Sequence, residues 1–108
     1  MSSKGFRITD GKGFGITFAN GWTISVQFGW GNYCDNYDRI PAHYDKGDEN
    51  RRCGEDGSQT AECAAINPKG DMVDLPAFMS DGDPYTVSNR STTAQVLQLM
   101  NWVAEQQP

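Results

Sequence analysis

The sequence lacks a long apolar run, a paired set of cysteines and any excess of basic charge. No stretch reaches the roughly 20 apolar residues that a membrane span needs, and residues 1–10 lack the apolar segment of a signal peptide. The net charge of −5 opposes binding to phosphate backbones, so we expect no binding to nucleic-acid duplexes. Together these absences predict a cytoplasmic protein with no membrane partner.

Cysteine and histidine are too irregularly spaced to indicate a metal centre. Cys34, His43, Cys53 and Cys63 follow one another at intervals of nine, ten and ten residues, whereas structural zinc ligands come in closely spaced pairs. We expect no metal, no cofactor and no disulfide, with zinc binding and a Cys34–Cys53 bridge as alternatives. A nucleophile pair of Cys34 and His43 is conceivable, but no oxyanion motif accompanies it.

Three N-terminal segments alternate apolar and polar residues with the period of a β-strand. They span residues 5–9, 14–19 and 22–28. A three-residue turn at 19–21 pairs Ile16 with Ile24 and places all the large apolar side chains on one face, whereas a two-residue turn would divide them between two faces. Burial of a single apolar face favours the longer turn, with Gly21 in the left-handed region.

A second hairpin and a helix follow in the C-terminal half. Residues 61–66 and 71–75 flank a turn at 67–70, where Pro at the second position and Gly at the fourth favour a type I turn. Residues 92–106 begin with a capping-box pattern and carry an apolar stripe with helical spacing. The prolines in residues 76–90 predict a loop there.

These elements predict an α+β fold in one domain spanning 1–108. We expect a four- to five-stranded antiparallel sheet built from hairpins, one C-terminal helix (92–106) packed on one face, and a long loop insertion at 29–59. The small residues Ala61, Cys63 and Ala65 would let the helix approach the sheet closely. A core of this size is marginal, so a homodimer is expected.

The insertion at 29–59 holds the candidate ligand-binding residues. Its aromatic rings can stack on flat ligands, its amides can form directional hydrogen bonds, and its arginines can bind phosphate. The candidates are Trp30, Asn32, Tyr33, Asn36, Tyr37, Arg39, Arg51 and Arg52. The alternative is that the aromatic side chains only cover a sheet edge and fill gaps in the core.

The segments ITFANGWTISVQFGWGNYCDN and AECAAINPKGD, followed by a short C-terminal helix, resemble a family of small proteins encoded by tailed bacteriophages. The resemblance covers most of the chain except residues 38–58. It brings no established activity and no functional residue. It implies a phage accessory protein that works in the cytoplasm of the bacterial host.

Three functions fit this background. The first is a non-enzymatic counter-defence protein that sequesters a small nucleotide immune signal. The second is an acidic inhibitor, similar in role to anti-CRISPR proteins, that covers a basic surface of a host defence protein with Asp71, Asp74, Asp81 and Asp83. The third is a small hydrolase that uses Cys34 and His43. We expect the protein not to be an enzyme.

Overall fold

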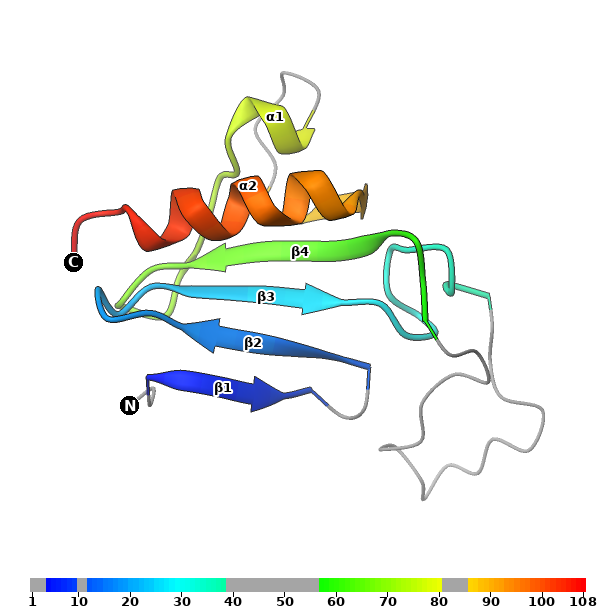
Figure 1. Ribbon diagram of the computed structural model, residues 1–108, viewed down its shortest axis with the longest axis horizontal. Helices are drawn as coiled ribbons and strands as arrows, with labels where there is room; N and C mark the ends of the chain where they lie inside the picture. Colours follow the sequence, from blue (N-terminus) through cyan, green and yellow to red (C-terminus); the bar gives the residue numbers. More distant parts are fainter. Residues whose placement is uncertain (1–3, 10–11, 39–56, 81–85) are drawn as a thin grey trace.

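The computed structural model describes residues 4–9, 12–38, 57–80 and 86–108, which form an open antiparallel sheet with a long helix along one face (Figure 1). The strands are β1 (Gly5–Ile8), β2 (Gly13–Thr17), β3 (Thr23–Gln27), β4 (Ala61–Ile66), β5 (Met72–Val73) and β6 (Ser88–Ser91). The helices are α1 (Ala77–Ser80) and α2 (Thr93–Ala104). The predicted fold class is confirmed, with six strands described rather than four or five.

The order of the sheet is β1-β2-β3-β4-β5, and every pairing is antiparallel. The far side of β4 is shared by two short strands, since β5 pairs with Ala65 and Ile66 while β6 pairs with Ala61 and Cys63. The two central strands, β3 and β4, therefore have neighbours on both sides.

The predicted register of the first hairpin is confirmed. Ile16 lies opposite Ile24, and the Phe18 amide donates to the Trp22 carbonyl at 2.8 Å. Gly21 has a φ of 87°, a conformation that costs glycine little because it has no Cβ. The three-residue turn thus places the apolar side chains of β2 and β3 on the same face.

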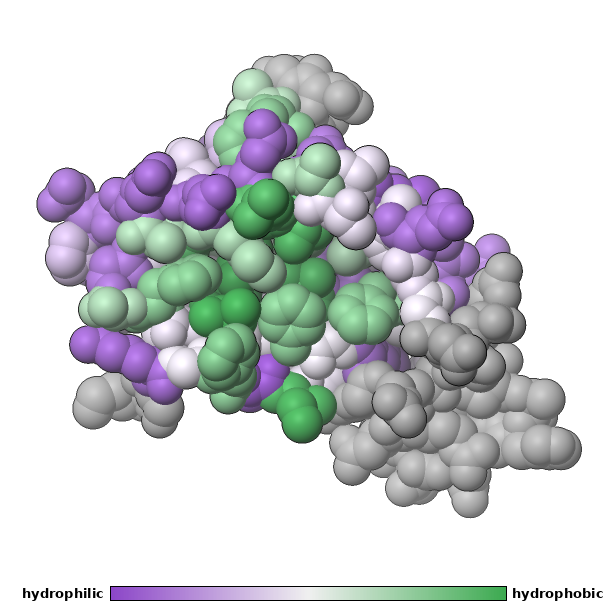
Figure 2. All heavy atoms as spheres, in the orientation of Figure 1, coloured by the Kyte–Doolittle hydropathy of each residue, from purple (hydrophilic) through white to green (hydrophobic). Residues whose placement is uncertain are grey.

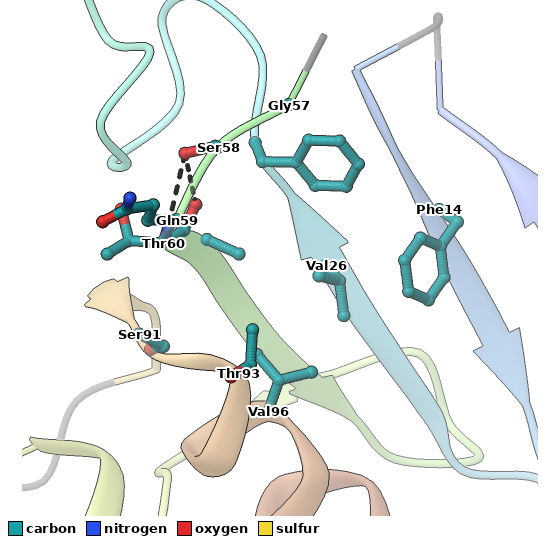
Figure 3. A pocket seen from close by; sticks show the side chains of 11 residues that line it. Phe14, Val26, Gly57, Ser58, Gln59, Thr60, Ser91, Thr93 and Val96 are labelled. Carbon is teal, nitrogen blue, oxygen red and sulfur yellow. Dashed lines mark hydrogen bonds between the residues drawn. The ribbon is translucent and has the colours of Figure 1, made fainter.

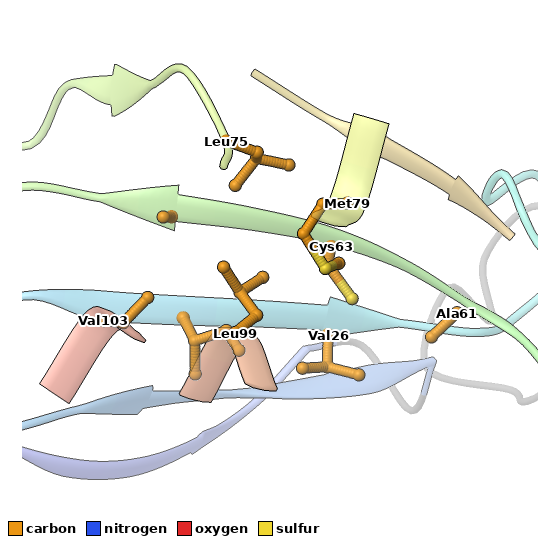
Figure 4. Close-up of a cluster of buried hydrophobic side chains, with 9 residues drawn as sticks. Val26, Ala61, Cys63, Leu75, Met79, Leu99 and Val103 are labelled. Carbon is orange, nitrogen blue, oxygen red and sulfur yellow. The ribbon is translucent and has the colours of Figure 1, made fainter. Parts of the chain in front are cut away.

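The core lies between this face and α2 (Figure 4). Helix α2 packs on β3 and β4, and Ile24, Leu99 and Val103 are all 0% exposed. On β4, Cys63 and Ala65 are also 0% exposed and belong to this core. Small side chains on β4 therefore line the surface on which the helix packs, as predicted.

The terminal turns of a helix leave backbone groups without helical partners. At both ends of α2, side chains form hydrogen bonds with such groups. Thr92 and Gln95 form the predicted capping box at the start. At the other end, Asn20 Nδ2 donates to the carbonyl oxygens of Val103 and Gln106, each at 2.9 Å. The turn of the first hairpin thus holds the C-terminus of the helix.

The prediction that 76–90 is a loop is wrong for two segments, α1 and β6. Strand β6 was not predicted because its sequence, SNRS, has no apolar side chain. It is instead held by polar contacts, since the Ser88 hydroxyl accepts from the Cys63 amide at 3.2 Å and pairs with the Ser91 hydroxyl at 2.5 Å. Strand β5 is shorter than the predicted 71–75. No helix in the described ranges has the length and apolar character needed to cross a membrane.

Candidate functional site

The segment 29–38, here called the aromatic loop, follows β3 and folds back on itself. The Gly31 amide donates to the Tyr37 carbonyl at 3.0 Å, and the Tyr37 amide donates to the Cys34 carbonyl at 3.1 Å. Gly31 has a φ of 82°, which favours glycine. The part of the predicted insertion that is described here is therefore an ordered set of turns without strand or helix.

Two asparagines attach the aromatic loop to the sheet. Asn32 accepts from the Gly29 amide at 3.0 Å and donates from Nδ2 to Glu62 on β4 at 3.1 Å. Asn36 is 3% exposed, and its Nδ2 donates to the carbonyl oxygens of Phe28 and Gly57 at 2.8 and 3.1 Å. These amides hold the loop in shape, so their contribution to a site is to position the residues around them.

The structure brings Tyr33 and Tyr37 together on the outside of the aromatic loop. Their ring centroids lie 5.8 Å apart with an interplanar angle of 14°, and the residues are 49% and 42% exposed. Trp30 is half-buried, with Lys12 Nζ 3.9 Å from the centre of its ring. Of the three predicted stacking residues, the two tyrosines thus present the more exposed rings.

Arg90 on β6 contacts Tyr33 and Asp35 of the aromatic loop and was not predicted as a site residue. Its amide donates to the Tyr33 carbonyl at 2.9 Å, and its Nε lies 3.6 Å from Asp35 Oδ1. The two side chains of this ion pair are 50% and 46% exposed. Arg90 also has a φ of 51°, an uncommon conformation for a residue with a Cβ, which costs about 1 kcal/mol or more.

The predicted arginines Arg39, Arg51 and Arg52 lie outside the described residues, as do His43 and Cys53. Asp81 and Asp83 of the acidic set also lie outside, whereas Asp71 and Asp74 are exposed near the β4–β5 hairpin. The predictions that the three arginines bind a ligand and that the aspartates bind a basic partner stay predictions.

A cavity of about 280 Å³ lies next to the aromatic loop, between the sheet and the start of α2 (Figure 3). Its apolar wall is formed mainly by Phe14, Val26, Phe28 and Val96. The other lining residues are Gly57, Ser58, Gln59, Thr60, Ala61, Ser91 and Thr93. Its volume lies near the lower end of the range for ligand pockets, so it can accept one small apolar group.

Hydrogen bonds connect the aromatic loop to residues that line the cavity. Asn36 bonds to the carbonyl oxygens of Phe28 and Gly57, which both line the cavity, and the Asp35 amide donates to the Thr60 hydroxyl at 3.0 Å. No local sequence pattern predicts the cavity, because its lining comes from β2, β3, β4, β6 and α2, most of which lie far apart in the chain.

Two of the three cysteines are described, and both are buried. Burial raises the pKa of the Cys63 thiol to about 11, against the opposing effect of hydrogen bonds from Ser88 and Ser91. The thiol therefore stays protonated near neutral pH and is a poor nucleophile. Cys34 is 0% exposed, with its Sγ 3.5 Å from the Gly29 carbonyl oxygen, so its position gives the hydrolase hypothesis no support.

No group of three or more potential metal ligands gathers within the described segments. The expected absence of zinc and of a disulfide stays a prediction, because Cys53 and His43 lie outside those segments. No known protein family, curated protein or solved structure matches this chain significantly.

Proposed function

We propose that this is a non-catalytic binding protein that holds a small, flat anionic ligand, preferably a nucleotide, at the aromatic loop. The observation that carries the proposal is the exposed, nearly parallel pair of Tyr33 and Tyr37, with the backbone of Tyr33 hydrogen-bonded to that of Arg90. In this arrangement the tyrosine rings stack on the base, and the guanidinium group of Arg90 meets a phosphate.

The shape of the aromatic loop favours binding because little of it needs to become ordered. Asn32 already ties the loop to Glu62 on β4, Asn36 ties it to Phe28 just after β3, and Asp35 ties it to Thr60 just before β4. A preorganised loop loses less conformational entropy when a ligand binds. The stacking energy of about 1–3 kcal/mol per base is then available for affinity.

The ion pair between Arg90 and Asp35 provides a cation for the ligand, because Arg90 can exchange the Asp35 carboxylate for an anionic group. Both side chains are about half exposed, so the pair is screened by water and contributes little to stability. A phosphate can replace the Asp35 carboxylate at Arg90 and form a bidentate contact there. The chain's net charge of −5 makes such a local cation necessary for binding an anion.

The resemblance to tailed-phage proteins favours a biological role in counter-defence, in which the protein sequesters a nucleotide immune signal of the host. The competing hypothesis is an acidic inhibitor that covers a basic protein surface. Its support among the described residues is the pair of exposed aspartates, Asp71 and Asp74. The two hypotheses differ in what the protein retains from a cell lysate.

The proposal is tested by incubating the protein with lysate from defence-activated bacteria, removing unbound material and analysing what denaturation releases. A sequestering protein releases an intact nucleotide. A chemically altered nucleotide would indicate an enzyme. Recovery of a stoichiometric protein partner without a small molecule, with affinity that falls as salt rises, would contradict sequestration and favour the inhibitor.

Site variants then locate the binding with purified cyclic and linear nucleotides in calorimetric titrations. Tyr33→Ala or Tyr37→Ala should weaken the binding of an adenine or guanine nucleotide by roughly 5- to 150-fold, the equivalent of one lost stacking contact. Phe78→Ala is the control, because Phe78 is an exposed aromatic residue on α1. Equal affinity in all three variants would refute the proposed site.

A further inference from the structure

The apolar face of the sheet extends beyond the area that α2 covers. Phe6 lies opposite Ile16, and Ile8 lies opposite Phe14, so these four side chains share the face that bears Ile24. Helix α2 packs on β3 and β4, and a helix about 10 Å wide covers two strands spaced about 4.8 Å apart. Phe6 is accordingly 87% exposed and Ile8 81% exposed.

The flank of α2 that faces this uncovered area is apolar as well. Thr93 and Val96 line the cavity beside Phe14, and Leu97 lies one turn after Thr93 on the same flank. Leu97 is 61% exposed. The floor formed by β1 and β2 and the wall formed by α2 together make a surface that we call the apolar step. Its residues are Phe6, Ile8, Phe14, Ile16, Val96 and Leu97.

Figure 2 shows apolar side chains gathered over this face, with hydrophilic side chains around much of its margin. None of the six residues of the apolar step is charged. Arg7, the charged residue within β1, alternates to the opposite face of the sheet, opposite Gly15. The apolar step therefore does not select an oppositely charged partner, and two copies of this acidic protein would bring no like charges together there.

The edge of β1 that has no strand partner among the described residues is a poorer place for association than the apolar step. The strand has four residues, carries Arg7, and starts at Gly5, whose φ of 119° departs from strand geometry. Short edge strands that carry charge are typical devices against edge-to-edge pairing. Association should therefore use the face of β1 and β2 rather than strand pairing along their edge.

We propose that a second copy of this chain docks on the apolar step. Packed sheets lie about 10 Å apart, close to the distance of a helix from the sheet beneath it. The partner's β1 and β2 can therefore lie in the same layer as α2, with their edge against Leu97. A two-fold axis generates the same contact in the other copy. The strands β1 and β2 of each copy then cover the part of the partner's sheet that the partner's own α2 leaves exposed.

The area of the apolar step is sufficient for such a dimer. An aromatic side chain covers roughly 150–250 Å², so Phe6 alone offers on the order of 170 Å². The six side chains together offer on the order of 500 Å² in each copy, or roughly 1,000 Å² in the pair, which is the lower limit for a specific interface. An exposed apolar patch of about 500 Å² on a monomer is also often an interaction site. Because Phe14 and Val96 also line the cavity, docking places the partner against its rim.

Sedimentation equilibrium of the full chain tests the proposal, from low to high micromolar concentration. The wild-type protein should be a dimer at high concentration. The double variant Phe6→Ser/Ile8→Ser should dissociate at least about tenfold more readily, because it removes the most exposed apolar contacts. Arg7→Ser is the matched control, since it alters the same strand on the other face and should leave the dimer intact.

A second pair of variants tests the wall independently of β1. Leu97→Ser should weaken the dimer, whereas Gln98→Ser, at the next exposed position of α2, should not. Circular dichroism confirms that each variant is folded. A wild-type monomer at high micromolar concentration would overturn the proposal, as would a dimer that the folded Phe6, Ile8 and Leu97 variants leave unchanged. Neither outcome depends on whether the aromatic loop binds a nucleotide.

Discussion

Truncation of Ile24 to alanine should be among the most destabilising single changes in this protein. Ile24 is 0% exposed in the middle of β3, and the core around it includes Ala65, Leu99 and Val103. Ala65, directly opposite on β4, is too small to fill the space that the missing side chain leaves. The substitution therefore incurs both the lost transfer free energy and a cavity, and should lower the free energy of unfolding by about 3–4 kcal/mol.

The position of α2 predicts a graded series across the same face. Ile16 lies opposite Ile24 but is only half-buried, so Ile16→Ala should cost about 1–2 kcal/mol. Phe6 lies opposite Ile16 and is 87% exposed, so Phe6→Ala should cost less than about 0.5 kcal/mol in the monomer. The three residues share one face, and only their distance from the helix differs.

Urea denaturation monitored by tryptophan fluorescence measures this series. It is carried out at low protein concentration, so that association on the apolar step does not contribute. A loss of about 3 kcal/mol should also lower the melting temperature by roughly 12–20 °C for a domain of this size. If Phe6→Ala proved as costly as Ile24→Ala, the inference that α2 leaves β1 uncovered would be refuted. Equal stability of Ile24→Ala and wild type would contradict the register of the first hairpin.

Three further changes test other parts of the structure. Asn36→Ala should lower the free energy of unfolding by about 1–3 kcal/mol and speed amide hydrogen exchange in the aromatic loop, because the two hydrogen bonds from the buried Asn36 side chain to the carbonyl oxygens of Phe28 and Gly57 are lost. Thr92→Ala should cost about 1 kcal/mol by removing the helix cap, and normal stability would argue against the capping box. The raised pKa of Cys63 means that the folded state keeps its proton as pH rises from 9.0 to about 11, so stability should fall across that interval. Cys63→Ala should remove this part of the pH dependence, and an unchanged profile would contradict the assignment.

Much of the fold follows from local patterns in the sequence. The alternation in residues 14–19 and 22–28 predicts two strands, and burial of a single face is sufficient to choose the three-residue turn at Gly21. The capping box at Thr92 and the apolar stripe after it predict the start and the buried side of α2. These predictions succeed because the interactions that decide them join residues close in the chain.

Strand β6 shows where local patterns are insufficient. Its four residues have no apolar side chain, and it forms because the edge of β4 offers unpaired backbone groups and Ser88 can bond to Cys63. The role of Asn36 is likewise set by partners eight and 21 residues away, so the sequence marks it only as a polar residue in a loop. Arg90 becomes a candidate site residue only because β6 brings it to Tyr33.

The sequence by itself determined the register of the central hairpin, the positions of the second hairpin and α2, and that one face of the sheet is apolar. Periodicity along the chain carries this information, because side chains alternate in strands and recur every three or four residues in helices. Only the tertiary structure decided how far α2 extends over that face, and therefore that Ile24 is buried while Phe6 is exposed. The two residues have the same apolar character in the sequence, and they differ because a single helix is too narrow to cover the four strands from β1 to β4.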